Sequence, residues 1–340
     1  MKSNKSVAIY SIIRNNKRCY ELACVKKEDI NNNNYNYHLL IYDILLNKIT
    51  NKKNNAHYDE IYNLRHYYYS SEDKHFLLSS SEKSIRLWNI SSNEITIELT
   101  INNIYNNYQY YYSFNNSCLL FDYENFFIIC GGSNKIKTPI FNKEGKQINT
   151  INDSSLENVN YIETAYIENK PYILLSGSTH IESYDFNSKN FNNGSLKKYT
   201  PSIVYEDNNS SYSNSYEKKV KESYSCICKL FKNNKMIYLI SGQSDGRVLI
   251  FDFDSTAEIH SFNVEQYNQS PIYGLCSLNE KYFLVGKNRE IHVIDFDNKS
   301  IIESYRNIYQ DEGIKGIEKI NIPEKGELII SYGNIIIFWK

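Results

Sequence analysis

The side chains that could hold a metal ion are seven cysteines and seven histidines. Cys226 and Cys228 are separated by one residue, which in a strand places both thiols on one face. A zinc site needs two more ligands at short spacing, and the neighbouring sequence offers none. The cysteines sit mostly inside apolar runs, as buried free thiols do. No histidine pair has metal-ligand spacing either, so we expect no metal and no cofactor; the histidines are His38, His57, His66, His75, His180, His260 and His292.

Motifs for nucleophilic catalysis or phosphate binding are not found in the sequence. The pair Gly131-Gly132 is followed by SNKIKTP, which is typical of a strand end and not of a phosphate-binding loop. The segment 176–178 reads Ser-Gly-Ser, without the Gly-x-Ser-x-Gly pattern of a nucleophile elbow. The basic run at 217–222 begins and ends with glutamate, which indicates a solvated loop edge. We therefore predict no catalytic residues, while an active site assembled from distant segments stays open as an alternative.

Composition narrows the class of protein. The 340 residues carry 38 Lys and Arg against 39 Asp and Glu, a formal charge of −1. This balance lacks the electrostatic footprint of a general binder of nucleic acid or anionic membrane. Hydrophobic residues make up 41 % of the chain, enough for a core, and no apolar run approaches the roughly 18 residues of a spanning helix. The short stretch 7–13 contains Tyr10 and Ser11 and reads as a strand, not a signal peptide. We expect a soluble protein, by default in the cytoplasm or nucleus.

A repeated pattern supplies the elements that would position any site. Each copy is an apolar run ending in Ser or Gly, a turn, and a second apolar run closed by a bulky and then a polar residue. The copies span 22–43, 76–89, 127–142, 173–185, 239–252, 283–295 and 328–340. Their closing polar positions are mostly 43 to 46 residues apart, with two longer intervals; these positions are Asp43, Asn89, Asn142, Asp185, Asp252, Asp295 and Lys340. Such a period indicates seven units of one architecture rather than two unrelated domains.

The copies predict small antiparallel sheets whose two faces are both covered. Adjacent residues such as Leu239 and Ile240 point to opposite faces of a strand, and both are apolar. Sheets stacked around an axis cover both faces and protect their edges. We therefore predict an all-β fold, a single domain over 1–340 that forms a seven-bladed β-propeller of four-stranded antiparallel blades. The expected blades are 7–53, 57–101, 117–151, 159–199, 223–263, 270–305 and 314–340.

Closure of this ring is a separate question. The chain ends at the third strand of the last blade, and only residues 1–6 precede the first strand. We expect either a very short closing strand from the N-terminus or a three-stranded final blade.

Two of the copies resemble a known family, the WD-repeat propellers. The resemblance lies in LISGQSDGRVLIFD at 239–252 and SIRLWN at 84–89. It implies a hydrogen-bonded tetrad of a strand Ser or Thr, a turn Asp, a loop His and a closing Trp. Ser241 and Asp245 match that tetrad in one unit, with Phe251 in place of Trp, and the Gly-His dipeptide that opens family repeats is missing. These departures predict a diverged propeller held mainly by apolar packing; its structural anchors are Asp43, Trp88, Asn89, Asp185, Ser241, Asp245, Asp252, Asp295 and Trp339.

Long insertions give the first candidate binding surface. In a four-stranded meander, the connections from second to third strand and from one blade to the next emerge on the same face. The three longest insertions, 28–37, 102–116 and 201–222, are of these two kinds. They are rich in tyrosine, which is enriched at interfaces because it buries much area at little rotamer cost. The partner-binding candidates are Tyr35, Tyr37, Tyr105, Tyr108, Tyr110, Tyr111, Tyr112, Phe114, Tyr212 and Tyr216.

The same insertions can also be interpreted as surface loops without a function. Runs such as NNNNYNY are also what low-complexity drift produces in idle surface loops. The segment 108–114, with its dense aromatics, could instead pack against the disc.

Three functions compete on this basis. The first is a non-catalytic scaffold or adaptor, a monomeric propeller within a larger complex that holds other proteins or peptides on the loop-rich face. The second is a propeller enzyme or small-ligand binder, which acidic or histidine side chains converging on the central channel would favour. The third is an RNA-associated subunit, which needs a basic face that the net charge does not suggest. The first is the leading hypothesis, and neither nucleic acid nor membrane insertion is expected.

Overall fold

The computed structural model describes residues 6–31, 34–102, 114, 116–122, 125–131, 138–151, 156, 158–177, 179–186, 197–201, 224–233, 235–264, 270–306, 313–323 and 325–339. These residues form antiparallel sheets of consecutive strands, six with four strands and one with three. The sheets follow the chain in order as blades one to seven.

The strands of the first four blades are β1 (Val7–Arg14), β2 (Lys17–Asn31), β3 (Asn34–Asp43) and β4 (Lys48–His57); β5 (Ile61–Tyr69), β6 (Lys74–Ser81), β7 (Ser84–Asn89) and β8 (Thr96–Asn102); β9 (Asn116–Asp122), β10 (Asn125–Gly131), β11 (Thr138–Phe141) and β12 (Gln147–Ile151); and β13 (Tyr161–Ile167), β14 (Lys170–Ser176), β15 (Ile181–Asp185) and β16 (Lys197–Tyr199). The boundary expected between the first two blades falls inside β4, which continues to His57.

The remaining strands are β17 (Tyr224–Lys232), β18 (Lys235–Gln243), β19 (Arg247–Asp252) and β20 (Glu258–Asn263) in blade five; β21 (Ile272–Ser277), β22 (Tyr282–Lys287), β23 (Glu290–Asp295) and β24 (Ser300–Tyr305) in blade six; and β25 (Gly316–Ile322), β26 (Gly326–Tyr332) and β27 (Ile336–Trp339) in blade seven.

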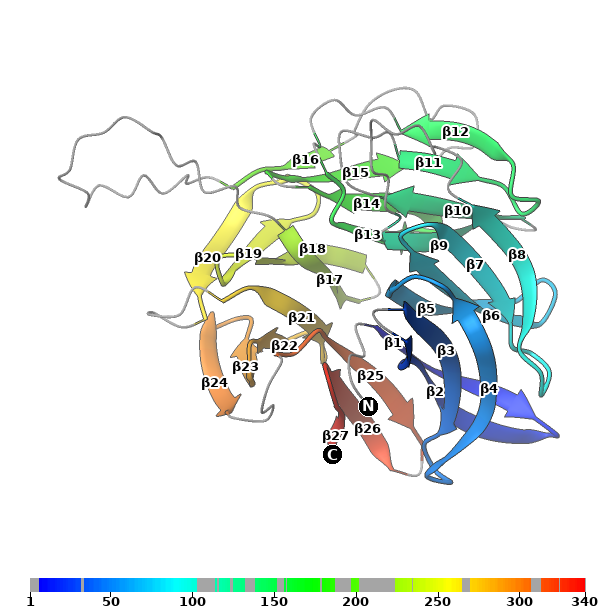
Figure 1. The fold of residues 1–340 in the computed structure, drawn as a ribbon. Helices are drawn as coiled ribbons and strands as arrows, with labels where there is room; N and C mark the ends of the chain where they lie inside the picture. The colour runs from blue at the N-terminus through cyan, green and yellow to red at the C-terminus, as the bar shows by residue number, and fades with distance from the viewer. Residues whose placement is uncertain are drawn as a thin grey trace.

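The blades stand around a central axis, with the first strand of each blade innermost (Figure 1). The protein is therefore a seven-bladed β-propeller, and the predicted all-β fold class is confirmed. Within the described part of the chain, no helix has the length and apolar character that crossing a membrane requires.

The hydrophobic core lies between neighbouring blades, as strands apolar on both faces require. In β19, Val248, Leu249, Ile250 and Phe251 are all fully buried. Leu249 and Phe251 pack toward blade four, whereas Val248 and Ile250 pack toward blade six. Successive side chains of one strand thus pack into two different blade interfaces. Burial of each large apolar side chain contributes about 1.5–3 kcal/mol to the free energy of folding.

The ring closes through direct packing of the first blade on the last. Val7 and Leu22 of blade one share an apolar cluster with Ile330 and Tyr332 of blade seven. Blade seven has three strands, in the order β25-β26-β27, as one of the two sequence-based alternatives held. Residues 1–5 lie outside the described part of the chain.

The repeated polar anchors cap the turn that follows the third strand. Asp43 Oδ1 accepts hydrogen bonds from the backbone N–H groups of Leu45 and Leu46, at 2.9 and 2.8 Å. Asp252 and Asp295 accept the equivalent bonds in blades five and six. A carboxylate that satisfies two backbone donors fixes a tight turn, which explains why Asp recurs at the end of the repeat.

A buried hydrogen-bonded network in blade two contains a serine, a histidine and a tryptophan, three of the residue types that the sequence resemblance implied. Trp88 Nε1 donates to Ser79 Oγ at 2.8 Å, and Ser79 Oγ lies 2.7 Å from His57 Nε2. On its other side, His57 Nδ1 lies 3.0 Å from Ser81 Oγ and 3.1 Å from Ser84 Oγ. Serine hydroxyls thus lie where the resemblance implied a turn Asp, and the histidine comes from β4 of the preceding blade.

Blade five, where the sequence matched best, lacks this network among the described residues. The buried Ser241 hydroxyl finds no hydrogen-bond partner there, since Phe251 has no N–H to donate. Asp245 instead binds Arg247, with Oδ2 2.6 Å from Nε and Oδ1 accepting the backbone N–H at 3.0 Å. Ser241 and Asp245, which match the resemblance in sequence, therefore do not form the hydrogen-bonded tetrad in this blade.

This contrast between blades two and five gives a paired prediction. The substitution Ser79→Ala leaves the Trp88 N–H and one nitrogen of His57 without the hydroxyl they bind. It should lower the free energy of unfolding by about 1–3 kcal/mol. The substitution Ser241→Ala removes a hydroxyl without a partner, and should change that free energy by less than about 0.5 kcal/mol or raise it. Urea denaturation of both variants measures the difference. Equal losses at the two sites would contradict the assignment.

Two histidines buried in neutral form predict a loss of stability in acid. Burial lowers the pKa of His57 from 6.5 to about 3, with Arg86 adding to the effect. Burial also lowers the pKa of His66 to about 3, with His75 adding to it. The unfolded chain therefore takes up protons first, and stability that is complete above about pH 6.5 declines from there toward pH 3.

The expected slope is up to about 1.4 kcal/mol per pH unit for each of the two histidines. Urea denaturation at pH 7.5, 6.5 and 5.5 measures it, and His66→Gln should remove about half of the decline. Unchanged stability of the native protein between pH 7.5 and 5.5 would show that these histidines are not buried as described.

Candidate functional site: the central channel

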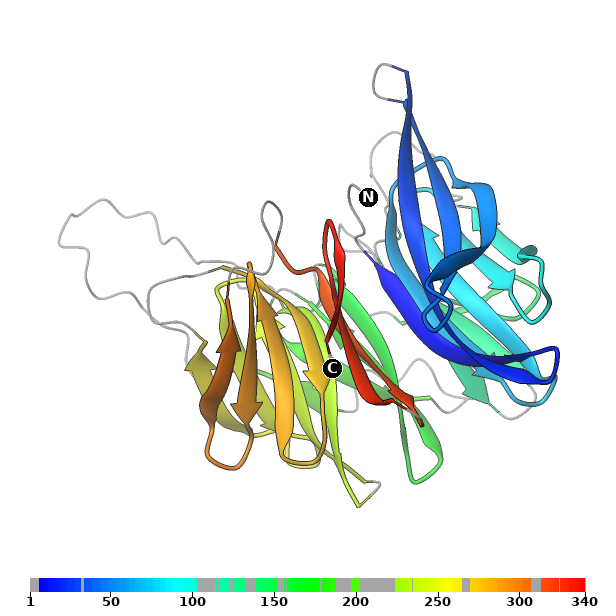
Figure 2. The same ribbon diagram turned by 90° about the horizontal axis from the view of Figure 1, so that it is seen from below.

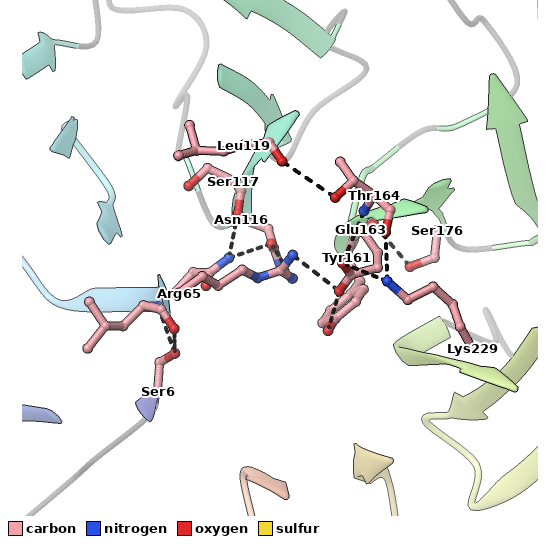
Figure 3. A network of polar contacts seen from close by, with 12 residues as sticks. Ser6, Arg65, Asn116, Ser117, Leu119, Tyr161, Glu163, Thr164, Ser176 and Lys229 are labelled. Atoms are coloured by element: carbon pink, nitrogen blue, oxygen red, sulfur yellow. Dashed lines mark hydrogen bonds and ion pairs between the residues drawn. The ribbon is translucent and has the colours of Figure 1, made fainter. Parts of the chain in front are cut away.

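The channel is lined by the innermost strands, and several of them place one polar or charged side chain within it. Arg65 comes from β5, Asn116 from β9, Glu163 from β13, Lys229 from β17 and Glu318 from β25. These strands pack closely on one another around the axis, so apolar residues fill their blade-facing positions. The strand positions that do not face a neighbouring blade point toward the central axis, where a charged side chain can keep contact with water. Figure 3 shows Arg65, Asn116, Glu163 and Lys229 converging from four different blades.

The Glu163 carboxylate is the centre of this network. Its Oε2 lies 3.3 Å from Arg65 Nη1, and its Oε1 lies 3.2 Å from Lys229 Nζ. Lys229 Nζ also donates to the Thr164 carbonyl at 2.6 Å, and the Thr164 N–H donates to Glu163 Oε1 at 3.1 Å. Tyr161 OH donates to Glu163 Oε2 at 3.4 Å. One carboxylate thus joins blades two, four and five.

Two carboxylates in this channel titrate in opposite directions. Burial alone would raise the pKa of Glu163, but Lys229 and Arg65 outweigh it and hold that pKa below its ordinary value. Glu318 is an exposed residue on the cavity lining, and desolvation by the protein around it raises its pKa to about 7. Repulsion by Glu163 adds to that rise, and Arg65 opposes it. Near neutral pH, Glu163 is therefore an anion, whereas Glu318 is divided between its two forms.

Amide and hydroxyl groups extend the network toward blades one and three. Asn63 Nδ2 donates to Asn116 Oδ1 at 2.6 Å, and Arg65 Nη2 donates to the same oxygen at 3.3 Å. The Leu64 N–H donates to Ser6 Oγ at 2.7 Å, which ties the start of the chain to β5 (Figure 3). The network therefore also positions the segment that leads into the first blade.

A polar cavity of about 390 Å³ lies beside the network. Its lining includes Arg65, Tyr161, Tyr273, Lys315 and Glu318. The Arg65 guanidinium lies 4.9 Å from the centre of the Tyr161 ring, and Lys315 Nζ lies 5.2 Å from that of Tyr273. Mixed charge and aromatic faces suit a small polar ligand or a peptide side chain.

The thiol on this wall is not an activated nucleophile. Cys226 lines the cavity, and burial raises its pKa well above the ordinary value. The Cys226 thiol is thus protonated at neutral pH, whereas a nucleophilic cysteine needs a lowered pKa. Cys226 and Cys228 do lie in one apolar cluster, as their spacing predicted. The cysteines are free, and the described residues hold no group of three or more Cys, His, Asp or Glu suited to a metal ion.

Of the predicted partner-binding residues, three lie in the described part of the chain. Tyr37 and Phe114 are buried, with 7 % and 4 % of their surface exposed. Tyr37 packs in the cluster that contains Trp88, and Phe114 packs between blades two and three. Tyr35 is half-buried beneath Lys27, whose Nζ lies 3.5 Å from the ring centre. The others lie outside the described residues; they are Tyr105, Tyr108, Tyr110, Tyr111, Tyr112, Tyr212 and Tyr216.

The first predicted insertion is mostly strand. Glu28 pairs with Asn36 and Asp29 with Tyr35, so the segment 28–37 lengthens β2 and β3 into a hairpin. This hairpin extends beyond the rest of blade one (Figure 2). Glu28 Oε2 lies 2.6 Å from His38 Nε2 on it. The strand pairing between β2 and β3 continues through this segment, although its Asn-rich composition is typical of a loop.

The channel residues were missed in the sequence because each looks unremarkable alone. Arg65, Glu163, Lys229 and Glu318 lie far apart along the chain. Their shared signal is a charged residue inside the first strand of a repeat, in IYNLRHYYY, YIETAYI, YSCICKLFK and GIEKINI. Aligning the repeats on their first strands would have brought these positions together.

Comparison with known proteins agrees on the fold alone. No family model matches the sequence, and no curated protein sequence matches it. In contrast, 1267 chains of solved structures match the fold, so the architecture by itself points to no single task. One of them is the crystal structure of Chaetomium thermophilum Raptor, with a TM-score of 0.67 and 11 % identity over 99 % of this chain. The match spans 28 % of the Raptor chain, and at this identity it shows that the two share a propeller fold.

Proposed function

We propose that the chain is a non-catalytic protein-interaction propeller of the WD-repeat type, working as a scaffold or adaptor in a larger complex. The observation that carries this proposal is an apolar groove of about 240 Å³ between blade one and the three described strands of blade seven. It is lined by eight residues, of which seven are apolar or Cys and one is Tyr: Leu22, Cys24, Leu40, Tyr42, Ile49, Ile335, Ile336 and Phe338. Exposed apolar surface of this kind marks interaction sites.

The WD-repeat part of the proposal is supported by blade two. The His57, Ser79 and Trp88 side chains form three members of the tetrad that the resemblance implies. In blade seven, Trp339 Nε1 donates to Ser331 Oγ at 2.9 Å, which repeats the Trp and Ser pair. The proposed compartment is the cytoplasm or nucleus, in keeping with this class of propeller.

The non-catalytic part is supported by the channel chemistry. The Glu163 carboxylate forms ion pairs with Arg65 and Lys229, and these two cations lower its pKa. A carboxylate paired in this way is a weak general base. Its contacts across three blades suit a structural role.

The test compares the proteins that co-purify with the tagged chain and with two folded variants. One variant changes Phe338 to Asp in the groove, and the other changes Tyr105, Tyr108, Tyr110, Tyr111 and Tyr112 to Ser. Phe114 is retained because it packs in the core. Loss of a reproducible set of partners by either variant supports the interaction role and identifies the surface used. Identical partner sets for all three proteins would contradict it.

A second candidate function is binding of a small ligand in the channel. It is favoured by three charged side chains, Arg65, Lys315 and Glu318, that line a 390 Å³ cavity. Glu318 has no hydrogen bond or ion pair within the described part of the chain, so it could receive a cationic group. Thermal unfolding with a panel of small amines tests this idea. A shift in midpoint that Glu318→Gln abolishes would support it, and no shift with any amine would oppose it.

A further inference from the structure

Two β-bulges turn tyrosines toward the central cavity. In β5, Ile61 and Asn63 pair with consecutive residues of β6, which leaves Tyr62 without a pairing partner in the sheet. In β21, the register likewise passes over Tyr273. Both tyrosines line the 390 Å³ cavity, and Tyr273 keeps 43 % of its surface exposed. Bulges re-aim side chains and occur often beside active sites, so this open aromatic surface is available to a ligand.

Lys315 provides the positive end of this surface. It directly precedes β25 and lines the cavity, with its Nζ 5.2 Å from the centre of the Tyr273 ring. Within the described part of the chain, no carboxylate forms an ion pair with Lys315. A lysine that lies beside an aromatic ring and lacks an acidic partner can receive a carboxylate from a ligand.

Glu318 provides the negative end, on β25 itself. It lines the cavity and forms no hydrogen bond or ion pair with the residues that the structure describes. The charges that shift its pKa are those of Arg65 and Glu163. Arg65 is already engaged, because its guanidinium lies 3.3 Å from the Glu163 carboxylate and donates to Asn116 Oδ1 at 3.3 Å. Desolvation outweighs the attraction of Arg65 and raises the pKa of Glu318 to about 7, so this carboxylate still lacks a matching cation.

The spacing of the two charged ends limits what fits between them. Lys315 and Glu318 are three residues apart, which in an extended chain separates their Cα atoms by about 10 Å. Lys315 is not among the groups that shift the pKa of Glu318, so the two side chains do not neutralise one another. A ligand that satisfies both therefore needs a carboxylate and an ammonium at opposite ends of a chain, not on one carbon.

We propose that the central cavity binds an elongated zwitterion, with its carboxylate against Lys315, its ammonium against Glu318 and its chain along the ring of Tyr273. A long-chain amino acid and a short linear peptide share this chemistry. A cavity of about 390 Å³ is within the usual size range of small-molecule sites. The inference rests on the second candidate function, ligand binding in the channel, and names the class of ligand.

The experiment uses the full chain and matched probes in isothermal titration calorimetry. ε-Aminocaproate carries its two charges at opposite ends and should bind with a saturable isotherm. Hexylamine lacks the carboxylate and hexanoate lacks the ammonium. Each should bind at least tenfold more weakly, because one charged side chain of the protein is left unpaired. Glycine, with both charges on one carbon, should show no binding at the same concentrations.

Protein variants locate the site. Glu318→Gln should weaken binding of ε-aminocaproate at least tenfold, because it removes the partner of the ammonium. Lys315→Gln should bind ε-aminocaproate no more tightly than the native protein binds hexylamine. Lys83→Gln, the same change at an exposed lysine outside the cavity lining, should bind as the native protein does. Circular dichroism confirms that each variant is folded.

Triglycine distinguishes the two sources of this chemistry, because it places the same two charges at the ends of a peptide chain. Tighter binding of triglycine than of ε-aminocaproate would assign the site to short peptides. Weaker binding of triglycine would assign it to long-chain amino acids. Either order supports the inference when Lys315→Gln and Glu318→Gln both weaken the tighter of the two ligands.

Three results would overturn the inference: no saturable binding of either zwitterion, hexylamine binding as tightly as ε-aminocaproate, or binding that Lys315→Gln and Glu318→Gln leave unchanged. If hexylamine binds and Glu318→Gln abolishes that binding, the channel still receives amines and only the zwitterion is wrong. The interaction role is tested by co-purification and is independent of these results. The proposals are thereby tested separately.

Discussion

Replacing Trp88 with alanine is expected to lower the free energy of unfolding by about 3–5 kcal/mol. Trp88 is fully buried in the cluster shared by blades one and two, and it donates its indole N–H to Ser79. The substitution leaves a large cavity and removes one of the hydrogen bonds to Ser79 Oγ in one step. Urea denaturation monitored by far-ultraviolet circular dichroism measures the loss.

The variant Trp88→Phe separates packing from hydrogen bonding at this position. It keeps most of the ring but removes the N–H, and should cost about 1–2 kcal/mol. If Trp88→Ala cost no more than Trp88→Phe, the side chain would not fill the interface between the first two blades.

Removal of the Glu163 carboxylate is the other change with a large expected effect. The substitution Glu163→Ala leaves Arg65 and Lys229 facing one another without their shared counter-ion, and should lower the free energy of unfolding by about 3 kcal/mol. Because these side chains are mostly shielded from solvent, added salt should recover only part of the loss. Chemical denaturation at low and at high salt measures both effects.

An exposed ion pair provides the matched control. Lys83 Nζ lies 3.0 Å from Asp59 Oδ1, and the lysine is largely in solvent. Asp59→Ala should therefore cost less than about 1 kcal/mol. Equal costs for Asp59→Ala and Glu163→Ala would mean that the channel network adds no more stability than a surface pair.

Fold class and blade number could be predicted because they follow from local pattern. Adjacent apolar residues such as Val248 and Leu249 require cover on both faces of a strand, and the turn anchors Asp43, Asp252 and Asp295 recur at near-constant spacing. A three-stranded last blade was one of two alternatives that the sequence left open, and the described strands of blade seven form a three-stranded sheet. These features depend on neighbours in sequence.

The candidate sites could not be predicted in the same way because they depend on which blades meet. Arg65 and Glu163 are brought together by ring geometry, and nothing in either local sequence marks the other as a partner. The groove needs Ile49 from the first blade and Phe338 from the last, which only closure places side by side. The hairpin at 28–37 was read as a loop from its Asn content, whereas cross-strand register decides its structure.

Closure of the ring by the first and last blades is the claim on which both sites depend. A double-mutant cycle between Leu22→Ala and Ile330→Val tests it, because these residues come from opposite ends of the chain and share one apolar cluster. Urea denaturation of the native protein, the two single variants and the double variant gives the coupling energy. We predict a coupling of about 0.5 kcal/mol or more, and additivity within about 0.3 kcal/mol would contradict a closed ring.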